Sequence, residues 1–510
     1  MMMTSALRRA AVVYPQGLAI ASGGERRTWS QTVDRIACLA GALQEMGVRS
    51  GSHVATLALN SPRYFELLMA VWWAGGVVVP LNTRLAWGEI CFILGHSEAC
   101  LLLSDEHFRS AADQTRAEAS LAGLRVAVLD DTTYERMLLT PPATDACRAL
   151  EALAGIFYTG GTTGRPKGVE LTHENFAFAA MNMQRDLRHD EGTVYLHAAP
   201  LFHLADFGIG LGTTLGAGAH SFIAQFSTSV FYERLRTDGV THLQLVPTML
   251  SMVLDAAERD DGLLAQIRSI SYGAAPISQP LLERLLGAFP NARIQQFYGM
   301  TECCGACVML PDDCHTLTAN PQRLLAAGQP IVGFEVRIAK VGGDQSLPPG
   351  GVGEIQMRGP AVMRGYWKDP EKTAETLQGG WLRSGDGGRM DEDGFVYVVD
   401  RLKDMVISGG ENIYCAEVES ALATHPGVAA CAVIGLPDDH WGERVHAVVV
   451  MQKDQVVEQA SLDRHIRGLI AGYKVPRSYD LRYTPLPLSA VGKVQKNVLR
   501  DECLSRGNDR

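Results

Sequence analysis

Residues 158–168 read YTGGTTGRPKG and combine residue types that together can hold an anion. Glycines let the backbone approach a phosphate closely and turn its N–H groups toward it. Thr159, Thr162 and Thr163 add hydroxyl donors, and Lys167 adds a mobile positive charge. A polar hairpin is the alternative interpretation, but four glycines are costly in conformational entropy for a turn alone. The stretch therefore predicts a phosphate-binding loop.

This loop is not a Walker A motif, in which Gly-Lys-Ser/Thr opens a helix. Here Lys167 follows Pro166, and residues 168–172 (GVELT) have the composition of a strand. We therefore expect the loop to join two strands, and a helix to begin only after Thr172.

Further short motifs follow the loop along the chain. They read PLFH (200–203), YGAAP (272–276), YGMTE (298–302), GEIQMRG (353–359), GYW (365–367), WLRSGD (381–386), DRLKDMVISGGENIYCAEVE (400–419) and GKVQK (492–496). In this order the series resembles the adenylate-forming superfamily, which includes acyl-CoA synthetases, peptide-synthetase adenylation domains and luciferases. Gly160 stands where that family frequently has serine, and the first 150 residues are similar to it in general pattern only.

The resemblance implies which residues bind ATP and Mg²⁺. Glu302 and Thr159 would be ligands of Mg²⁺, an ion that prefers hard oxygen ligands. Tyr298 would stack on adenine, and Asp386, helped by Arg401, would accept hydrogen bonds from the ribose hydroxyls. The other nucleotide-binding residues implied by the resemblance are Gly160, Gly161, Thr162, Thr163, Gly164, Lys167, Gly273, Ala274, Ala275, Pro276 and Gly299.

The resemblance also implies four catalytic residues, namely Lys493, His203, Thr301 and Glu302. Lys493 would contact the acid carboxylate and the α-phosphate and stabilise the charge that builds up between them. His203 would lie between the acyl and nucleotide pockets, and Thr301 would lie near the α-phosphate. Glu302 would act through the metal that it binds.

Helix and strand patterns alternate through most of the 510 residues, which indicates an α/β protein. Past residue 400 the pattern becomes that of a compact α+β module. We expect a large multi-subdomain α/β N-terminal domain over residues 1–400 and a small mobile α+β domain over residues 401–510. The resemblance makes Lys403 the hinge of this small domain. Gly409 and Gly410 would then lie against the channel by which the thiol of coenzyme A approaches.

Composition and charge limit the classes of partner and the cellular compartment that are compatible with the chain. The formal net charge of −10 argues against nucleic acid as a partner, because phosphate-backbone binding requires a basic face. The most apolar run, residues 67–81, is shorter than the roughly 20 residues that a membrane-spanning helix needs. The N-terminus lacks the apolar region of a signal peptide, and eleven cysteines are an odd number, so we expect free thiols and a cytoplasmic protein. A homodimer is compatible with the sequence.

One cysteine cluster, CCGACVMLPDDCH, contains Cys303, Cys304, Cys307, Cys314 and His315. The spacing of Cys304 and Cys307 would allow a metal site. No second cysteine pair follows at zinc-finger spacing, and we favour small buried residues beside a functional loop.

The sequence thus predicts an ATP-dependent acyl-CoA synthetase that uses ATP, Mg²⁺ and coenzyme A. It would form an acyl-adenylate from an apolar carboxylic acid and then the CoA thioester, releasing pyrophosphate and AMP. Residues 204–212 and 269–276, expected to line the acyl pocket, contain no cation that could neutralise a second carboxylate. We therefore favour a fatty acid, with a cinnamate-type acid such as ferulate or coumarate as the alternative. Asp206, the one charge in these segments, is expected to cap a helix that begins near Phe207.

Two other functions stay open. The thiol acceptor could belong to a carrier protein instead of coenzyme A, although the SGGENIY pattern of residues 408–414 favours coenzyme A. The chain could also be a non-catalytic protein that binds a nucleotide or an acyl-adenylate. The presence of Lys493, Glu302 and Asp386 argues against that function.

Overall fold

We describe the fold from a computed structural model, which covers residues 3–507 except 160–164, 274–276, 278, 316–320, 403, 410, 439, 454, 456 and 489–493. Several predicted site residues lie outside the described residues. They are Gly160, Gly161, Thr162, Thr163, Gly164, Ala274, Ala275, Pro276, Lys403, Gly410 and Lys493.

The chain forms two compact units. The first contains Met1–Glu335 and Met357–Leu382, and the second contains Val336–Gln356 and Arg383–Arg510. A large α/β N-terminal part and a small C-terminal part confirm the predicted fold class. The predicted division at residues 400 and 401 falls inside the second unit, and it stays a prediction.

The first unit contains a seven-stranded sheet with the order β18-β8-β7-β4-β3-β5-β6. Strands β7 (Leu153–Thr159) and β8 (Lys167–Thr172) are antiparallel, and Thr159 pairs with Lys167. The predicted phosphate-binding loop therefore joins two strands, as the sequence indicates. The other strands are β3 (His53–Leu57), β4 (Val77–Pro80), β5 (Leu101–Asp105), β6 (Arg125–Leu129) and β18 (Gly365–Tyr366).

Helix α7 (His173–Asp186) begins directly after β8, where the sequence predicts a helix start. The Thr172 side chain accepts a hydrogen bond from the N–H of Asn175, and the Asn175 side chain accepts one from the N–H of Thr172. This reciprocal arrangement satisfies backbone donors that the first turn leaves without intrahelical partners.

A nine-stranded sheet forms the other half of the first unit, with the order β15-β14-β13-β12-β11-β9-β10-β1-β2. Strands β9 to β13 are parallel neighbours, so their carboxyl ends lie at one edge. The strands of this sheet are β1 (Leu18–Ser22), β2 (Glu25–Thr28), β9 (Val194–His197), β10 (Ala219–Phe222), β11 (His242–Leu245), β12 (Ser269–Gly273), β13 (Arg293–Tyr298), β14 (Val308–Leu310) and β15 (Gln329–Pro330).

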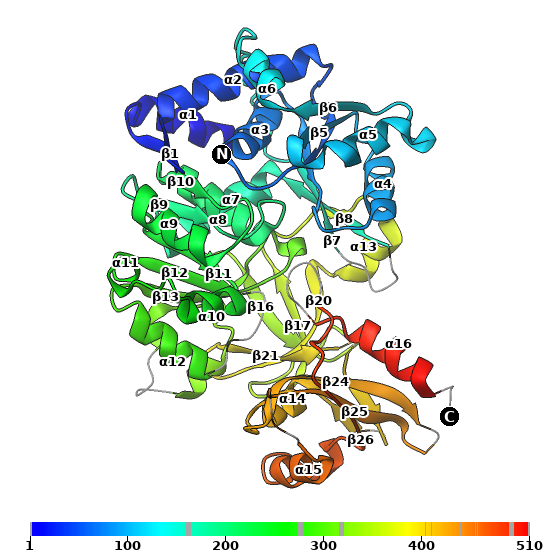
Figure 1. The fold of residues 1–510 in the computed structure, drawn as a ribbon. Coiled ribbons are helices and arrows are strands. Elements are labelled where there is room, and N and C mark those ends of the chain that lie inside the picture. The colour runs from blue at the N-terminus through cyan, green and yellow to red at the C-terminus, as the bar shows by residue number, and fades with distance from the viewer. Residues whose placement is uncertain are drawn as a thin grey trace. The chain divides into compact units, whose positions relative to one another are not determined.

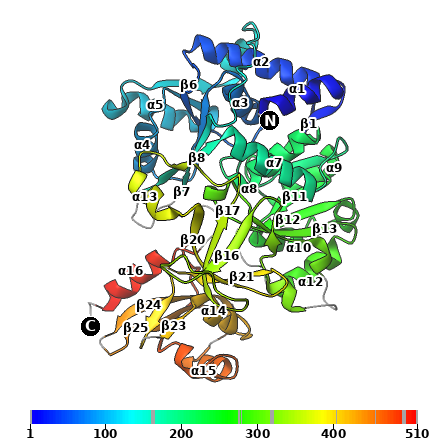
Figure 2. The same cartoon turned by 180° about the vertical axis from the view of Figure 1, so that it is seen from behind.

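Helices α7 and α8 (Leu204–Leu215) lie side by side in the first unit (Figures 1 and 2). A Cβ at Gly212 of α8 would lie 2.8 Å from the Met183 side chain of α7, so the two helices are in close contact. Buried aromatic rings connect these helices to β7 and α3 (Pro62–Trp73). They are Trp72, Phe157, Phe176 and Phe207.

The apolar run at residues 67–81 is divided between α3 and β4 and is buried throughout. Gly75, whose φ is 88°, makes the turn between the two elements. Among the described residues, no helix is both long enough and apolar enough to cross a membrane.

The second unit is built largely from two small sheets. The first sheet contains β16 (Glu335–Ala339), β17 (Gly353–Arg358), β20 (Trp381–Met390) and β21 (Val396–Arg401). The second contains β22 (Val406–Ser408), β23 (Glu411–Ile413), β24 (Val428–Asp438), β25 (Gly442–Met451) and β26 (Ser478–Arg482). Helices α14 (Cys415–Ala423), α15 (Gln459–Arg467) and α16 (Lys496–Gly507) complete the unit.

Candidate active site

Glu302 lies in a short 3₁₀ turn, Thr301–Cys303, that follows strand β13. Its side chain is buried, and its Oε1 accepts a hydrogen bond of 2.7 Å from the Tyr366 hydroxyl. The Glu302 carbonyl oxygen accepts a second bond of 2.8 Å from the N–H of Met363. Residues 363–366 therefore fix both the backbone and the carboxylate of the predicted magnesium ligand.

Lys167 lies close to the ring of Tyr366. Strand β18 pairs with β8, and the Lys167 Nζ is 5.4 Å from the centroid of the Tyr366 ring. Burial lowers the pKa of Lys167, the charge of Lys372 lowers it further, and Glu302 acts in the opposite direction. Burial also raises the pKa of Tyr366, as does its contact with Glu302, so its hydroxyl is a neutral donor. The structure thus brings Lys167 and Glu302 together around Tyr366, and Thr159 is the strand partner of Lys167.

Tyr366 has no role assigned from the sequence, where the GYW motif (365–367) is the available signal. Its position beside β8 is visible only in the structure. Its contact with Glu302 joins residues 64 positions apart, and no local pattern reports such a contact.

Gly273 ends strand β12 and Gly299 directly follows the neighbouring strand β13, and both are sites where a side chain does not fit. A Cβ at Gly273 would lie 2.5 Å from the carbonyl oxygen of Phe297, and one at Gly299 would lie 2.1 Å from that of Gly305. The carbonyl oxygen of Tyr298 accepts a hydrogen bond of 3.0 Å from the N–H of Cys307. The segment from Tyr298 to Cys307 is therefore a closed loop that presents Thr301 and Glu302.

The cysteine cluster packs inside and beside this loop. Cys303, Cys304 and Cys307 are buried, and Cys304 has a φ of 55° at the turn. The His315 Nε2 lies 3.0 Å from the Tyr272 hydroxyl oxygen. Within the described part of the chain, no group of three or more His, Cys, Asp or Glu side chains could hold a metal ion.

His203 occupies the cap position before α8, and its ring centroid is 4.5 Å from that of Phe202.

The expectation that Asp206 caps a helix beginning near Phe207 is wrong. Helix α8 begins at Leu204, and the fully buried Asp206 accepts hydrogen bonds from the Tyr195 hydroxyl at 2.9 Å and from His197 Nδ1 at 2.5 Å. Strand β9 brings both partners beneath the helix, so this carboxylate is occupied by side chains instead of backbone N–H groups.

The second unit contains the residues predicted to bind ribose. Asp386 and Arg401 are direct partners in the pairing of β20 with β21. Asp386 is buried, and its N–H donates to the Ser384 Oγ at 3.0 Å. The N–H of Gly409 donates to the carbonyl oxygen of Trp441 at 2.8 Å, and its φ of 61° favours glycine.

Lys496, which begins α16, has no role assigned from the sequence. Its Nζ lies 2.8 Å from the Glu419 Oε1 of α14, and both side chains are largely buried. Burial acts to lower the pKa of Lys496, but the nearby Glu419, Cys415 and Asp400 together outweigh burial and the pKa is raised. The pair fixes the start of α16 three residues after the predicted catalytic Lys493.

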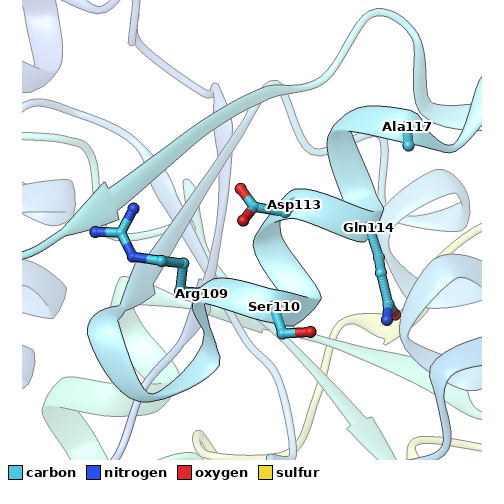
Figure 3. Close-up of a pocket in the computed structure, with 5 residues that line it drawn as sticks. All are labelled: Arg109, Ser110, Asp113, Gln114 and Ala117. Carbon is cyan, nitrogen blue, oxygen red and sulfur yellow. The ribbon is translucent and has the colours of Figure 1, made fainter.

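A hollow of about 530 Å³ lies elsewhere in the described part of the chain, on helix α5 (Arg109–Ala117) (Figure 3). All five of its lining residues come from this one helix, and none is a predicted site residue. Its two charged side chains are already paired, Arg109 with Glu106 and Asp113 with Arg116. We therefore do not assign the active site to this hollow.

Comparisons with known proteins show the family to which this chain belongs. The family model of the AMP-binding enzymes matches residues 7–367, and that of the AMP-binding enzyme C-terminal domain matches residues 417–493. A feruloyl-CoA synthase of an Amycolatopsis species is 39% identical over 96% of this chain and 97% of its own length. The fatty acid–[acyl-carrier-protein] ligase ScoC of Streptomyces coeruleorubidus is 34% identical over 96% of this chain and 93% of its own.

A solved structure supports the same relationship. The o-succinylbenzoate–CoA synthetase MenE of Bacillus subtilis, in complex with ATP and magnesium, superimposes with a TM-score of 0.85 at 30% identity. The superposition covers 97% of this chain and 99% of that structure. The chain therefore belongs to the family of AMP-binding enzymes and so to the adenylate-forming superfamily. It is an AMP-forming acid–thiol ligase that depends on ATP, Mg²⁺ and coenzyme A.

Proposed function

We propose that this ligase converts an apolar monocarboxylic acid into its CoA thioester through an acyl-adenylate. A carboxylate oxygen of the acid bonds to the α-phosphorus of ATP, and the bond from that phosphorus to the bridging oxygen breaks, which releases pyrophosphate. The sulfur of coenzyme A then bonds to the acyl carbon, the carbon–oxygen bond to AMP breaks, and the thiol proton passes to solvent. The observation that supports this proposal most directly is the group formed by Glu302, Tyr366 and Lys167, in which Lys167 begins the strand β8.

Glu302, Thr159 and Lys167 fit Mg²⁺ and phosphate by their chemistry. Glu302 supplies a buried carboxylate and Thr159 a hydroxyl, which are hard oxygen ligands of the kind that Mg²⁺ takes. Bound there, the ion would neutralise phosphate charge. Lys167 and the residues of the 160–164 loop would hold the β- and γ-phosphates as pyrophosphate departs.

The remaining assignments follow the resemblance. Tyr298 would stack on adenine above Gly273 and Gly299, where added side chains would clash with the backbone. Asp386 and Arg401, adjacent across β20 and β21, would bind ribose. Lys493 would stabilise the charge that develops during adenylation, Thr301 would act at the α-phosphate and His203 on the acid side.

For the acid we propose a cinnamate-type acid such as ferulate as the first candidate and a fatty acid as the second. The identity of 39% to a feruloyl-CoA synthase supports the first. The apolar segment at residues 204–212 and the relative ScoC support the second. Neither candidate needs a cation in the acyl pocket, whereas a dicarboxylate does.

A competition assay separates these acids. Ferulate, octanoate and malonate are supplied together with ATP, Mg²⁺ and coenzyme A, and the thioesters are quantified by mass spectrometry. We expect feruloyl-CoA to predominate. Predominance of octanoyl-CoA would reverse the order of the two candidates, and predominance of malonyl-CoA would contradict the apolar pocket.

The same assay, with a phosphopantetheinylated carrier protein in place of coenzyme A, tests the alternative acceptor that the name of ScoC suggests. We expect coenzyme A to be the better acceptor. Faster loading of the carrier would reassign the second half-reaction and leave the first unchanged.

A further inference from the structure

The backbone from His197 to Asp206, which contains His203, is held by side chains that sequence motifs do not mark. Asn60 follows strand β3 and directly precedes Ser61, the residue that caps α3. Its position is therefore fixed by a strand end on one side and a helix start on the other. The Asn60 side chain is buried, with an exposed fraction of 6%.

Asn60 makes three hydrogen bonds to alternate residues of that segment. Its Nδ2 donates to the carbonyl oxygens of His197 at 3.2 Å and Ala199 at 2.7 Å, and its Oδ1 accepts from the N–H of Leu201 at 2.8 Å. An amide side chain supplies two donor hydrogens and an acceptor oxygen, and all are used here. An aspartate side chain at this position would have no donor hydrogens, and its negative charge would repel the two carbonyl oxygens.

The two ends of the same segment are joined to each other. His197 Nδ1 donates to Asp206 at 2.5 Å, and His197 Nε2 lies 2.9 Å from His220 Nδ1. His197, Asp206 and His220 are all fully buried. Gly210, one turn beyond Asp206, allows α8 to approach His197, because a Cβ there would lie 2.5 Å from the ring.

His203 lies two residues after the last bond from Asn60 and three residues before Asp206. Its carbonyl oxygen accepts the N–H of Phe207 at 3.0 Å, which links it to the first turn of α8. A buried polar network is costly unless every member is satisfied, and a satisfied network fixes one arrangement of the backbone. An apolar contact would bury the same area without selecting a position for His203.

We propose that Asn60 and the His197–Asp206 pair are positioning residues that set the place of His203 for the acid substrate. This inference rests on the proposed function, which assigns His203 to the acid side. The three residues touch neither ATP nor the acid in this scheme, and they act through the backbone of residues 197–206. Misplacement of a binding group by about 1 Å can cost as much as 100-fold in rate.

Asn60→Ala tests this inference through the separation of two Michaelis constants. We expect the KM for the acid to rise at least tenfold, while the KM for ATP stays within twofold of wild type. Asn175→Ala is the matched control, because Asn175 is also buried and also makes three backbone hydrogen bonds, to Thr172, Pro360 and Val362. The acid KM of that variant is expected to stay within twofold of wild type.

The inference would be overturned if Asn60→Ala raised the KM for the acid and the KM for ATP equally. It would also be overturned if Asn175→Ala raised the KM for the acid as much as Asn60→Ala does. If Asn60→Ala does not fold, the near-isosteric Asp206→Asn is judged by the same criteria. Amide hydrogen exchange of residues 197–206 separates this inference from the proposed function, because it needs no substrate. Exchange there should accelerate in Asn60→Ala but not in Asn175→Ala, and unchanged exchange would contradict the positioning role whichever acid the enzyme uses.

Discussion

At the scale of single residues, the site depends on one tyrosine that joins two charged groups. Tyr366 donates to Glu302 and presents its ring to Lys167, which lies 5.4 Å from the ring centroid. The hydroxyl thereby restricts the orientation of a buried carboxylate. Removing the hydroxyl while keeping the ring separates these two contributions.

Tyr366→Phe is expected to weaken Mg²⁺ binding. A hydrogen bond to a charged group contributes about 1.5–3 kcal/mol, so the Mg²⁺ concentration for half-maximal adenylation should rise roughly tenfold or more. Mg²⁺ titration of the adenylation rate measures this shift. Tyr232→Phe is the control, since Tyr232 is buried and makes one hydrogen bond, to the Val253 carbonyl, outside the site. An unchanged Mg²⁺ dependence in Tyr366→Phe would refute the orienting role.

At the scale of elements, local signals predicted the hairpin around the phosphate loop and the start of α7. Thr172 lies three residues before its capping partner Asn175, so the pattern was readable from the sequence. Asp206 was misassigned because its partners Tyr195 and His197 belong to a different element. Asn60 carried no motif, and its bonds reach residues 137 and more positions away. Contacts between distant elements therefore account for what the sequence could not predict.

The contact between α14 and α16 gives a stability prediction. Lys496→Met would remove the ion-pair partner of Glu419 and leave only the hydrogen bond from the Val433 N–H, and we expect a loss of about 2 kcal/mol in the free energy of unfolding. A fully buried broken pair costs about 3–5 kcal/mol, but both side chains here keep some contact with water. Urea unfolding measures the change. Lys368→Met, which breaks an exposed pair with Glu98, should cost less than about 1 kcal/mol.

The pH dependence of this contribution follows from the raised pKa of Lys496, whose ordinary value is 10.5. A raised pKa in the folded state means that the stabilisation is complete below the unfolded value and is lost as the pH rises through the folded value. The difference in the free energy of unfolding between wild type and Lys496→Met should thus be constant near neutral pH. Equal stability of the two proteins at pH 7 would contradict the importance of the pair.

At the scale of the whole molecule, the proposed function divides the reaction into two half-reactions. The hinge role of Lys403 rests on the resemblance to the superfamily. Lys403→Pro would fix φ near −65° and restrict the preceding residue, which limits rotation at that point. We expect thioester formation from pre-formed acyl-adenylate to slow at least tenfold more than adenylation does. Single-turnover kinetics measure the two steps separately, and equal losses would remove Lys403 from this role.

The central claim is that the enzyme forms an acyl-adenylate with Lys493 as a catalytic residue. The most direct measurement is acid-dependent exchange of labelled pyrophosphate into ATP, by wild type and by Lys493→Ala, with ferulate and octanoate as separate acids. The account predicts exchange by wild type that requires an acid, and a loss of at least 100-fold in the folded variant. Acid-independent exchange, or exchange by Lys493→Ala at the wild-type rate, would contradict it.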